Sequence, residues 1–211
     1  MADVLAFSAH LDDAVWSCCG PLATADRAVV VTVFAGEPNG TNRPSELDRR
    51  AGFRTSREAL AARRREDRDA AELVGFKSVH LDLVDAAYRA GEYSVDVVES
   101  EVRRCLSMSP AGVIIGPLGV KHPDHELLGA AFRRAVKGRP AWLYEDLPYS
   151  VLHPTELERA LIAAGLKDSH DSKVALSPEV KRNAVHCYRS QVSEATHLDE
   201  ILGVERVHPF R

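Results

Sequence analysis

Residues 4–13 read VLAFSAHLDD and pass within ten positions from an apolar run to a histidine and two adjacent aspartates. The run Val4–Phe7 is typical of a buried strand, because it is short, apolar and followed at once by polar residues. We therefore expect His10, Asp12 and Asp13 to lie where this strand leaves the core. Ligands and reacting groups of α/β proteins gather at such strand ends.

Similar apolar runs recur along the chain and alternate with segments of helical length and pattern. The expected strands are Val4–Phe7, Ala28–Phe34, Ser78–Leu83, Gly112–Ile115 and Ala141–Tyr144. The expected helices are Asp13–Asp26, Glu46–Val74, Ser94–Ser107, His125–Val136, Pro154–Gly165 and Pro178–Gln191. Such alternation favours parallel strands joined by right-handed crossovers. The predicted fold is α/β: a Rossmann-like, doubly wound, mostly parallel sheet with helices on both faces.

Length and composition limit the architecture and the partners. A chain of 211 residues with 45% hydrophobic content predicts a single α/β domain, residues 1–191, and a C-terminal tail, residues 192–211. The tail docks either on that domain or on a second subunit, which would make a homo-oligomer. The net charge of −4 argues against nucleic acid, and the apolar runs are too short to predict a membrane span. Four cysteines without zinc-ribbon or disulfide-scaffold spacing favour a cytoplasmic protein.

A second polar cluster, KHPDHE at residues 121–126, follows the apolar run Gly112–Leu118. If this strand and Val4–Phe7 are parallel neighbours, both clusters emerge at the same edge of the sheet. Six side chains would then lie together: His10, Asp12, Asp13, His122, Asp124 and His125.

Groups of these types can build a catalytic metal site. Three histidine or carboxylate ligands leave a fourth position of zinc open for water, and a carboxylate beside the metal can act as general base. The alternative is that each cluster only begins a helix, since aspartate is a common N-cap and proline suits the first turn. Two such clusters at two strand ends favour the metal site.

The clusters also resemble the paired motifs of a known family, the PIG-L or LmbE-like zinc-dependent N-deacetylases, which remove acetyl groups from amino sugars and related conjugates. The motifs stand here as Ala9-His10-Leu11-Asp12-Asp13 and His122-Pro123-Asp124-His125. Further similar segments extend the resemblance over about residues 4–191; they are Arg63–Gly75, Leu83–Arg89, Tyr144–Tyr149 and Lys181–Gln191.

The resemblance implies a role for each matched residue. The implied zinc ligands are His10, Asp13 and His125, and the implied general base is Asp12. His122 would stabilise or protonate the tetrahedral intermediate, and Asp124 would hold His122 in the useful tautomer. Arg63 and Asp85 match positions that can touch the sugar; the alternative for them is a surface arginine and a turn aspartate.

The chain departs from the family pattern at three positions. Leu11 replaces a commoner proline, and Ala14 stands where many members have glutamate. Val120 stands where some members place a tyrosine that donates to the oxyanion. Such a donor must here come from elsewhere or be missing.

We therefore expect a hydrolase that uses zinc, with iron(II) or another divalent metal as the alternative, and that deacetylates a small N-acetylated amino sugar or glycoconjugate. A second alternative is an amidase acting on a thiol conjugate or another small N-acyl metabolite. A third is a non-catalytic α/β ligand-binding module, although no G-x-G-x-x-G follows the first strand. The Gly- and Pro-rich loop at residues 36–45 should lie at the ligand-binding edge of the sheet.

Overall fold

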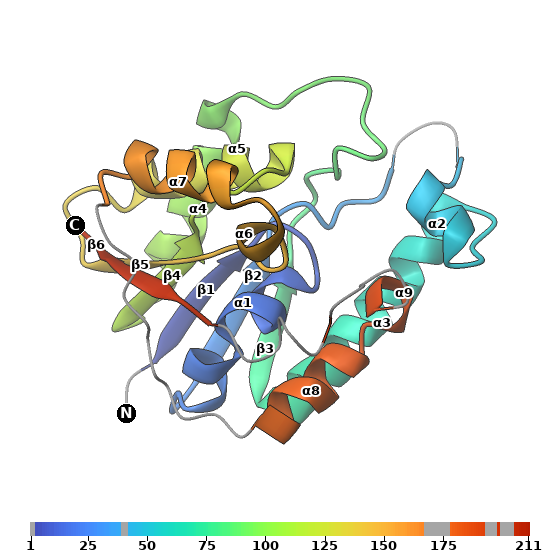
Figure 1. Cartoon of the computed structure of the whole chain (residues 1–211), viewed down its shortest axis with the longest axis horizontal. Helices are drawn as coiled ribbons and strands as arrows, with labels where there is room; N and C mark the ends of the chain where they lie inside the picture. Colours follow the sequence, from blue (N-terminus) through green and yellow to red (C-terminus); the bar gives the residue numbers. More distant parts are fainter. Residues whose placement is uncertain (1–2, 39–41, 167–177, 193–197, 199–204) are drawn as a thin grey trace.

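The computed structural model describes residues 3–38, 42–166, 178–192, 198 and 205–211. Its described strands form one sheet in the order β3-β2-β1-β4-β5-β6 (Figure 1). The strands are β1 (Val4–Ser8), β2 (Ala28–Thr32), β3 (Phe76–His80), β4 (Val113–Pro117), β5 (Ala141–Tyr144) and β6 (Val207–Phe210). Every pairing is parallel except that of β5 with β6. This confirms the predicted α/β fold with a mostly parallel sheet.

Strand β1 lies in the middle of the sheet and is buried on both faces. Val4 and Ala6 belong to one apolar core, whereas Leu5 and Phe7 belong to another. Side chains of a strand alternate between the two faces, so the continuous apolar run supplies both cores. The continuous apolar run by itself therefore predicts that β1 is a central strand of the sheet.

Helices cover both faces of the sheet (Figure 1). One core contains residues of α1 (Asp13–Ala23), α3 (Ser56–Val74) and α8 (Pro178–His186). The other contains residues of α4 (Val95–Met108), α5 (Pro123–Ala135) and α7 (Pro154–Ala163). Among the helices of the described ranges, none combines the length and the apolar character that crossing a bilayer requires.

The helix expected over Glu46–Val74 is wrong as a single element. It is divided into α2 (Glu46–Arg50) and α3, because Gly52 adopts a φ of 86° that ends the first helix. Ser45 caps α2 and Thr55 caps α3 through side-chain oxygens that accept backbone N–H groups. A further short helix, α6 (Tyr149–Leu152), was not expected from the sequence.

The described end of the tail packs on the body of the domain. β6 pairs with β5, and His208 of β6 lies 3.0 Å from the carboxylate of Glu145 (Nε2 to Oε1), both side chains being buried. Nearby, the Lys181 ammonium lies 2.9 Å from a Glu205 carboxylate oxygen, which ties the tail to α8. Between these parts, α9 (Arg189–Val192) follows α8. The rest of the tail and residues 39–41 of the loop lie outside the described residues.

Candidate metal-dependent hydrolase site

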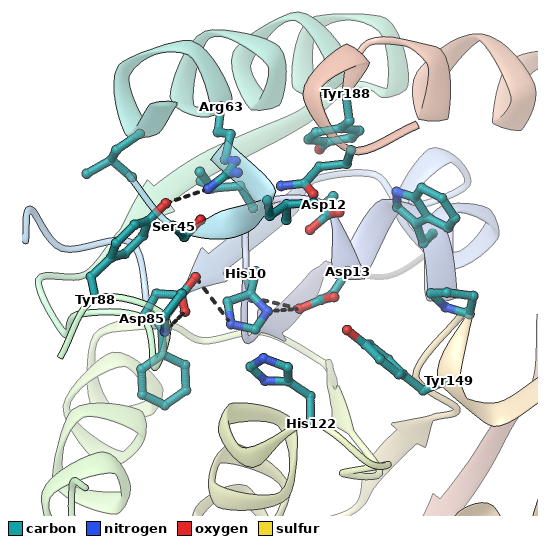
Figure 2. Close-up of a pocket in the computed structure, with 18 of the residues that line it drawn as sticks. His10, Asp12, Asp13, Ser45, Arg63, Asp85, Tyr88, His122, Tyr149 and Tyr188 are labelled. Carbon is teal, nitrogen blue, oxygen red and sulfur yellow. Dashed lines mark hydrogen bonds and ion pairs between the residues drawn. The ribbon is translucent and has the colours of Figure 1, made fainter. Parts of the chain in front are cut away.

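A cleft of about 480 Å³ opens at the carboxyl ends of the central strands. β1 pairs with β2 on one side and with β4 on the other. The connections to these two neighbours therefore run to opposite sides of β1, and the strand order reverses at this point. Open α/β sheets bind ligands at such a switch point. The cleft is lined by both polar clusters, by α2 and α3, and by the segment that follows β5 (Figure 2). The expected convergence of the two clusters is therefore observed.

Three side-chain atoms form a compact triangle beside the cleft, which we call the ligand triangle: His10 Nδ1, Asp13 Oδ2 and His125 Nε2. His125 Nε2 lies 3.2 Å from His10 Nδ1 and 3.2 Å from Asp13 Oδ2. His10 Nδ1 lies 3.4 Å from Asp13 Oδ2. His10 and Asp13 come from the turn between β1 and α1, whereas His125 lies in the first turn of α5. The triangle thus joins the two motifs.

The dimensions of the ligand triangle fit a tetrahedral divalent metal. Zinc bonds of about 2.0 to 2.1 Å at tetrahedral angles separate the ligand atoms by about 3.3 to 3.4 Å. Two other groups could also hold a metal ion, since their ligand atoms lie within 4.8 Å of one another: His10, His122 and His125, and His10, Asp85 and Asp124. The three atoms of the ligand triangle have the spacing of a tetrahedral site.

The charges of the triangle also suit a cation. Burial opposes protonation of His125, but Asp13 and Asp146 outweigh it and raise the pKa of this imidazole to about 10. Burial likewise opposes the charged form of Asp13, but His125 and His10 outweigh it and hold the pKa of that carboxyl well below its usual range. The carboxylates of Asp13 and Asp146 therefore favour a positive charge at the centre of the site, and a bound divalent cation would supply that charge.

Each imidazole of the triangle is oriented by a buried carboxylate. His125 Nδ1 lies 3.0 Å from Asp146 Oδ1. The other oxygen of Asp146 accepts the backbone N–H groups of Gly119 and Val120, at 2.8 and 3.1 Å. Asp146 Oδ1 thus faces His125 Nδ1, and a carboxylate at this position favours the tautomer that leaves a lone pair on Nε2, the atom of the triangle. This position of the His125 proton is inferred from the contacts of Asp146: one oxygen accepts two backbone N–H groups, and the other faces His125 Nδ1.

Asp124 orients His10 on the opposite side. Its Oδ2 lies 3.1 Å from His10 Nε2 and accepts the Ala86 N–H, and its Oδ1 lies 2.6 Å from the Arg89 guanidinium. The Arg89 guanidinium carbon lies 5.5 Å from the centroid of the Phe34 ring and 5.1 Å from that of the Tyr93 ring. The Arg89 cation, which contacts both rings of this aromatic pair, therefore helps to position the carboxylate that orients His10.

This contact differs from the one that the family resemblance implied, in which the Asp124 carboxylate holds His122. In the structure, Asp124 touches His122 through its backbone N–H, which donates to His122 Nδ1 at 3.2 Å. His122 is the N-cap of α5, so its ring lies over the free amides of the first turn. The bond leaves the other nitrogen, Nε2, to carry the proton and to act as a donor. Burial, reinforced by His10 and His125, lowers the pKa of His122 to about 4.

Asp12 has the properties of a general base. It stands at the N-cap position of α1, yet its side chain makes no capping hydrogen bond in the described helix. The N-cap explanation for this residue is therefore incomplete. Its carboxylate lines the cleft, and burial together with the neighbouring Asp13 raises its pKa to about 7. A base is most effective when its pKa lies near the working pH.

The polar wall of the cleft contains both residues expected to contact substrate. Arg63 is only 7% exposed, and its guanidinium bonds the Tyr88 hydroxyl at 2.8 Å and the Asp48 carboxylate at 2.7 Å. Asp85 lies on the same wall, with Oδ2 3.8 Å from His10 Nε2 (Figure 2). Both therefore line the cleft, and the surface alternative does not hold for Arg63. The contact with Asp48 also joins α3 to α2.

Sequence reasoning missed three residues of this site. Asp146 was covered only by the similar segment Tyr144–Tyr149 and was given no role, although it is the second residue after β5 and so has the same signal as the two motifs. Arg89 and Tyr149 have no comparable signal, since each lies several residues beyond a strand and reaches the site through a loop or a short helix. Tyr149 places its ring against His125, with 5.2 Å between centroids at an angle of 86°.

An α/β sheet with two histidines and two carboxylates gathered at the switch point fits the class of metal-dependent hydrolases. Comparison with known proteins then gives the family. The model of the PIG-L family, described as GlcNAc-PI de-N-acetylase, matches residues 5–136, and the chain belongs to this family. It is accordingly an amide hydrolase of the N-deacetylase class.

Individual relatives support the same class. The 2'-N-acetylparomamine deacetylase of Streptomyces fradiae is 30% identical over 98% of this chain and 80% of its own length. A deacetylase of the teicoplanin biosynthesis pathway, solved as its complex with bog, has a TM-score of 0.77 and 26% identity, covering 94% of this chain and 89% of that one. The A40926 pseudoaglycone deacetylase Dbv21 has a TM-score of 0.71 and 27% identity, covering 90% and 83%.

Proposed function

We propose that this chain is a zinc-dependent hydrolase that removes the acetyl group from a small N-acetylated amino sugar. The observation that carries the proposal is the ligand triangle of His10, Asp13 and His125, with its tetrahedral spacing of 3.2 to 3.4 Å. Two imidazoles and one carboxylate with an open position are a usual catalytic zinc set, although iron(II) accepts the same ligands. The relative that deacetylates 2'-N-acetylparomamine supports the choice of an amino sugar.

The proposed mechanism assigns a separate task to each residue. When bound, the metal would lower the pKa of water and polarise the acetamide carbonyl. Asp12 accepts one proton of the attacking water as the new carbon–oxygen bond forms. That proton then passes to the leaving nitrogen, directly from Asp12 or through His122, as the carbon–nitrogen bond breaks. Asp124 and Asp146 hold His10 and His125 in the tautomers that ligation requires.

The cleft suits a ligand of sugar size. Its volume of about 480 Å³ lies within the range usual for small-molecule sites. One wall carries Arg63 and Asp85, which can bond hydroxyl or amino groups. The opposite side includes Trp16, Leu147 and Pro148, which can cover the apolar face of a ring. Both kinds of surface are needed by a saccharide, so we propose that these residues bind the substrate.

The experiment measures metal content and acetate release together. Elemental mass spectrometry is applied to wild type, to His125→Ala and to a control, His186→Ala, which removes an exposed histidine of α8. The same samples are assayed on N-acetylglucosamine, 2'-N-acetylparomamine and an N-acyl thiol conjugate. We expect about one metal per chain in wild type and control, loss of metal in His125→Ala, and acetate release from an amino sugar.

The other outcomes separate the alternatives. Acetate release from the thiol conjugate and from neither amino sugar would change the proposed substrate to a thiol conjugate. A wild-type protein that takes up no divalent metal would contradict the mechanism and favour the non-catalytic binding module. The four cysteines are free, three of them buried, which supports our further proposal of a reducing, cytoplasmic location.

A further inference from the structure

The hydroxyl of Tyr149 is a donor in the cleft that the mechanism above does not use. The residue begins α6, directly after Pro148, and its ring lines the cleft. Figure 2 shows the hydroxyl directed toward Asp13. Among the described residues, none shares a hydrogen bond with this hydroxyl. A donor that faces the reacting groups and is not engaged elsewhere can bond the substrate without first losing a partner.

The position of Tyr149 is fixed by the segment that also fixes a proposed metal ligand. Ser150 N–H donates to the Asp146 carbonyl at 2.8 Å, and His153 N–H donates to the Tyr149 carbonyl at 2.8 Å. The carboxylate of the same Asp146 orients His125. The Tyr149 ring packs edge-on against His125, and its centroid lies 6.2 Å from that of His122. Residues 146–149 therefore place a ligand and a hydroxyl in one rigid arrangement.

Val120, two residues before His122, offers no donor to the cleft. Its side chain is apolar and fully buried, and its backbone N–H is engaged by Asp146. Gly119 gives its N–H to the same carboxylate. The amides of Gly119 and Val120 are thus directed toward Asp146.

We propose that Tyr149 is a catalytic residue that donates a hydrogen bond to the oxyanion of the tetrahedral intermediate. As water attacks, the π electrons of the acetamide carbonyl move onto its oxygen, and the Tyr149 O–H bonds that oxygen. When the intermediate collapses, the carbonyl re-forms, and the electrons of the carbon–nitrogen bond leave with the nitrogen, which takes the proton held by Asp12 or His122. Tyr149 keeps its own proton throughout. His122 is thereby released from the oxyanion and serves the leaving amine.

The test compares Tyr149→Phe with wild type and with Tyr144→Phe. Tyr144 is the matched control, because its hydroxyl is buried outside the cleft and donates to the Phe7 carbonyl at 3.0 Å. Zinc content, the melting temperature and the affinity of the zinc-loaded protein for methylphosphonate are measured for all three proteins. Methylphosphonate imitates the tetrahedral intermediate of acetyl transfer and needs no knowledge of the sugar.

The inference rests on the proposed function, and the two are tested separately. We expect Tyr149→Phe to keep its zinc, to lose affinity for methylphosphonate by about 10- to 100-fold, and to lose kcat by about 100- to 1,000-fold with KM within about threefold. Tyr144→Phe should lower the melting temperature and leave the methylphosphonate affinity unchanged. Unchanged affinity in Tyr149→Phe, or no binding by wild type, would overturn the role of Tyr149. Failure of wild type to release acetate from any amino sugar would instead overturn the proposed substrate.

Discussion

Replacing Asp146 by asparagine should turn the proposed ligand His125 away from metal binding while preserving the shape of the site. Asp146 accepts the N–H groups of Gly119 and Val120 with one oxygen, and its other oxygen lies 3.0 Å from His125 Nδ1. Asparagine has one oxygen and one NH₂ group in place of the two oxygens. If the NH₂ faced the turn, two buried N–H groups would lose their acceptor, so the oxygen must face the turn and the NH₂ must face His125.

The expected magnitude follows from that orientation. His125 can satisfy a facing NH₂ only by accepting at Nδ1, which moves its proton to Nε2, the atom in the ligand triangle. Metal binding would then require the tautomer with its proton on Nδ1. In that tautomer the Nδ1–H group and the asparagine NH₂ group are two buried donors that face each other, which costs about 1 to 3 kcal/mol. At about 1.4 kcal/mol for each factor of ten, zinc affinity should fall about 5- to 140-fold, which brackets the loss of about 10- to 100-fold usual for such orienting carboxylates.

The assay is a competition between the protein and a chelator of known zinc affinity. The control is Glu145→Gln, since the neighbouring Glu145 is equally buried but pairs with His208 of β6 rather than with the site. This control should destabilise the fold and keep zinc affinity. A folded Asp146→Asn protein that binds zinc within about threefold of wild type would refute the argument, because the tautomer would then not depend on Asp146.

Three further changes test other parts of the site. Asp12→Asn should keep the metal and lose kcat by about 100- to 10,000-fold, since it removes the proposed base; loss of metal in this variant would instead make Asp12 a ligand. Lys121 has a φ of 69° immediately before His122, so Lys121→Gly should be more stable than Lys121→Ala by about 1 kcal/mol in urea unfolding, and equal stabilities would show that this turn stores no strain. A Cβ at Gly129 would lie 2.7 Å from the Leu118 carbonyl oxygen, so Gly129→Ala should destabilise the fold by about 1 to 3 kcal/mol. Gly138→Ala is the comparison: a Cβ there meets no atom within 4 Å, so its effect measures only the cost of a positive φ in alanine.

The helix boundaries illustrate where sequence reasoning is sufficient and where it is not. Gly75 directly follows the helix expected to end at Val74, and Gly165 is the last residue of the helix expected over Pro154–Gly165; both adopt the positive φ typical of a helix end, 92° and 71°. Gly52 performs the same task inside the helix expected over Glu46–Val74 and was not recognised. The periodic pattern continues across it, because α2 and α3 both carry charged and apolar residues at helical spacing. Only the backbone conformation distinguishes a tolerated glycine from a break.

The sequence by itself determined the fold class and which polar side chains gather at the carboxyl edge of the sheet. Short apolar runs at helical intervals require a parallel sheet, and polar clusters directly after two strands must emerge at its carboxyl edge. The family resemblance added the expected ligands His10, Asp13 and His125, and these three form the compact triangle.

Only the tertiary structure decided which carboxylate serves which imidazole. Asp124 lies beside His122 in the sequence, yet its carboxylate reaches His10, 114 positions away. Likewise, the orienting group of His125 is Asp146, from the segment after β5. The physical reason is that such pairs depend on the order of the strands and on the rotation of α5 over the sheet, which long-range packing sets and local sequence patterns do not encode.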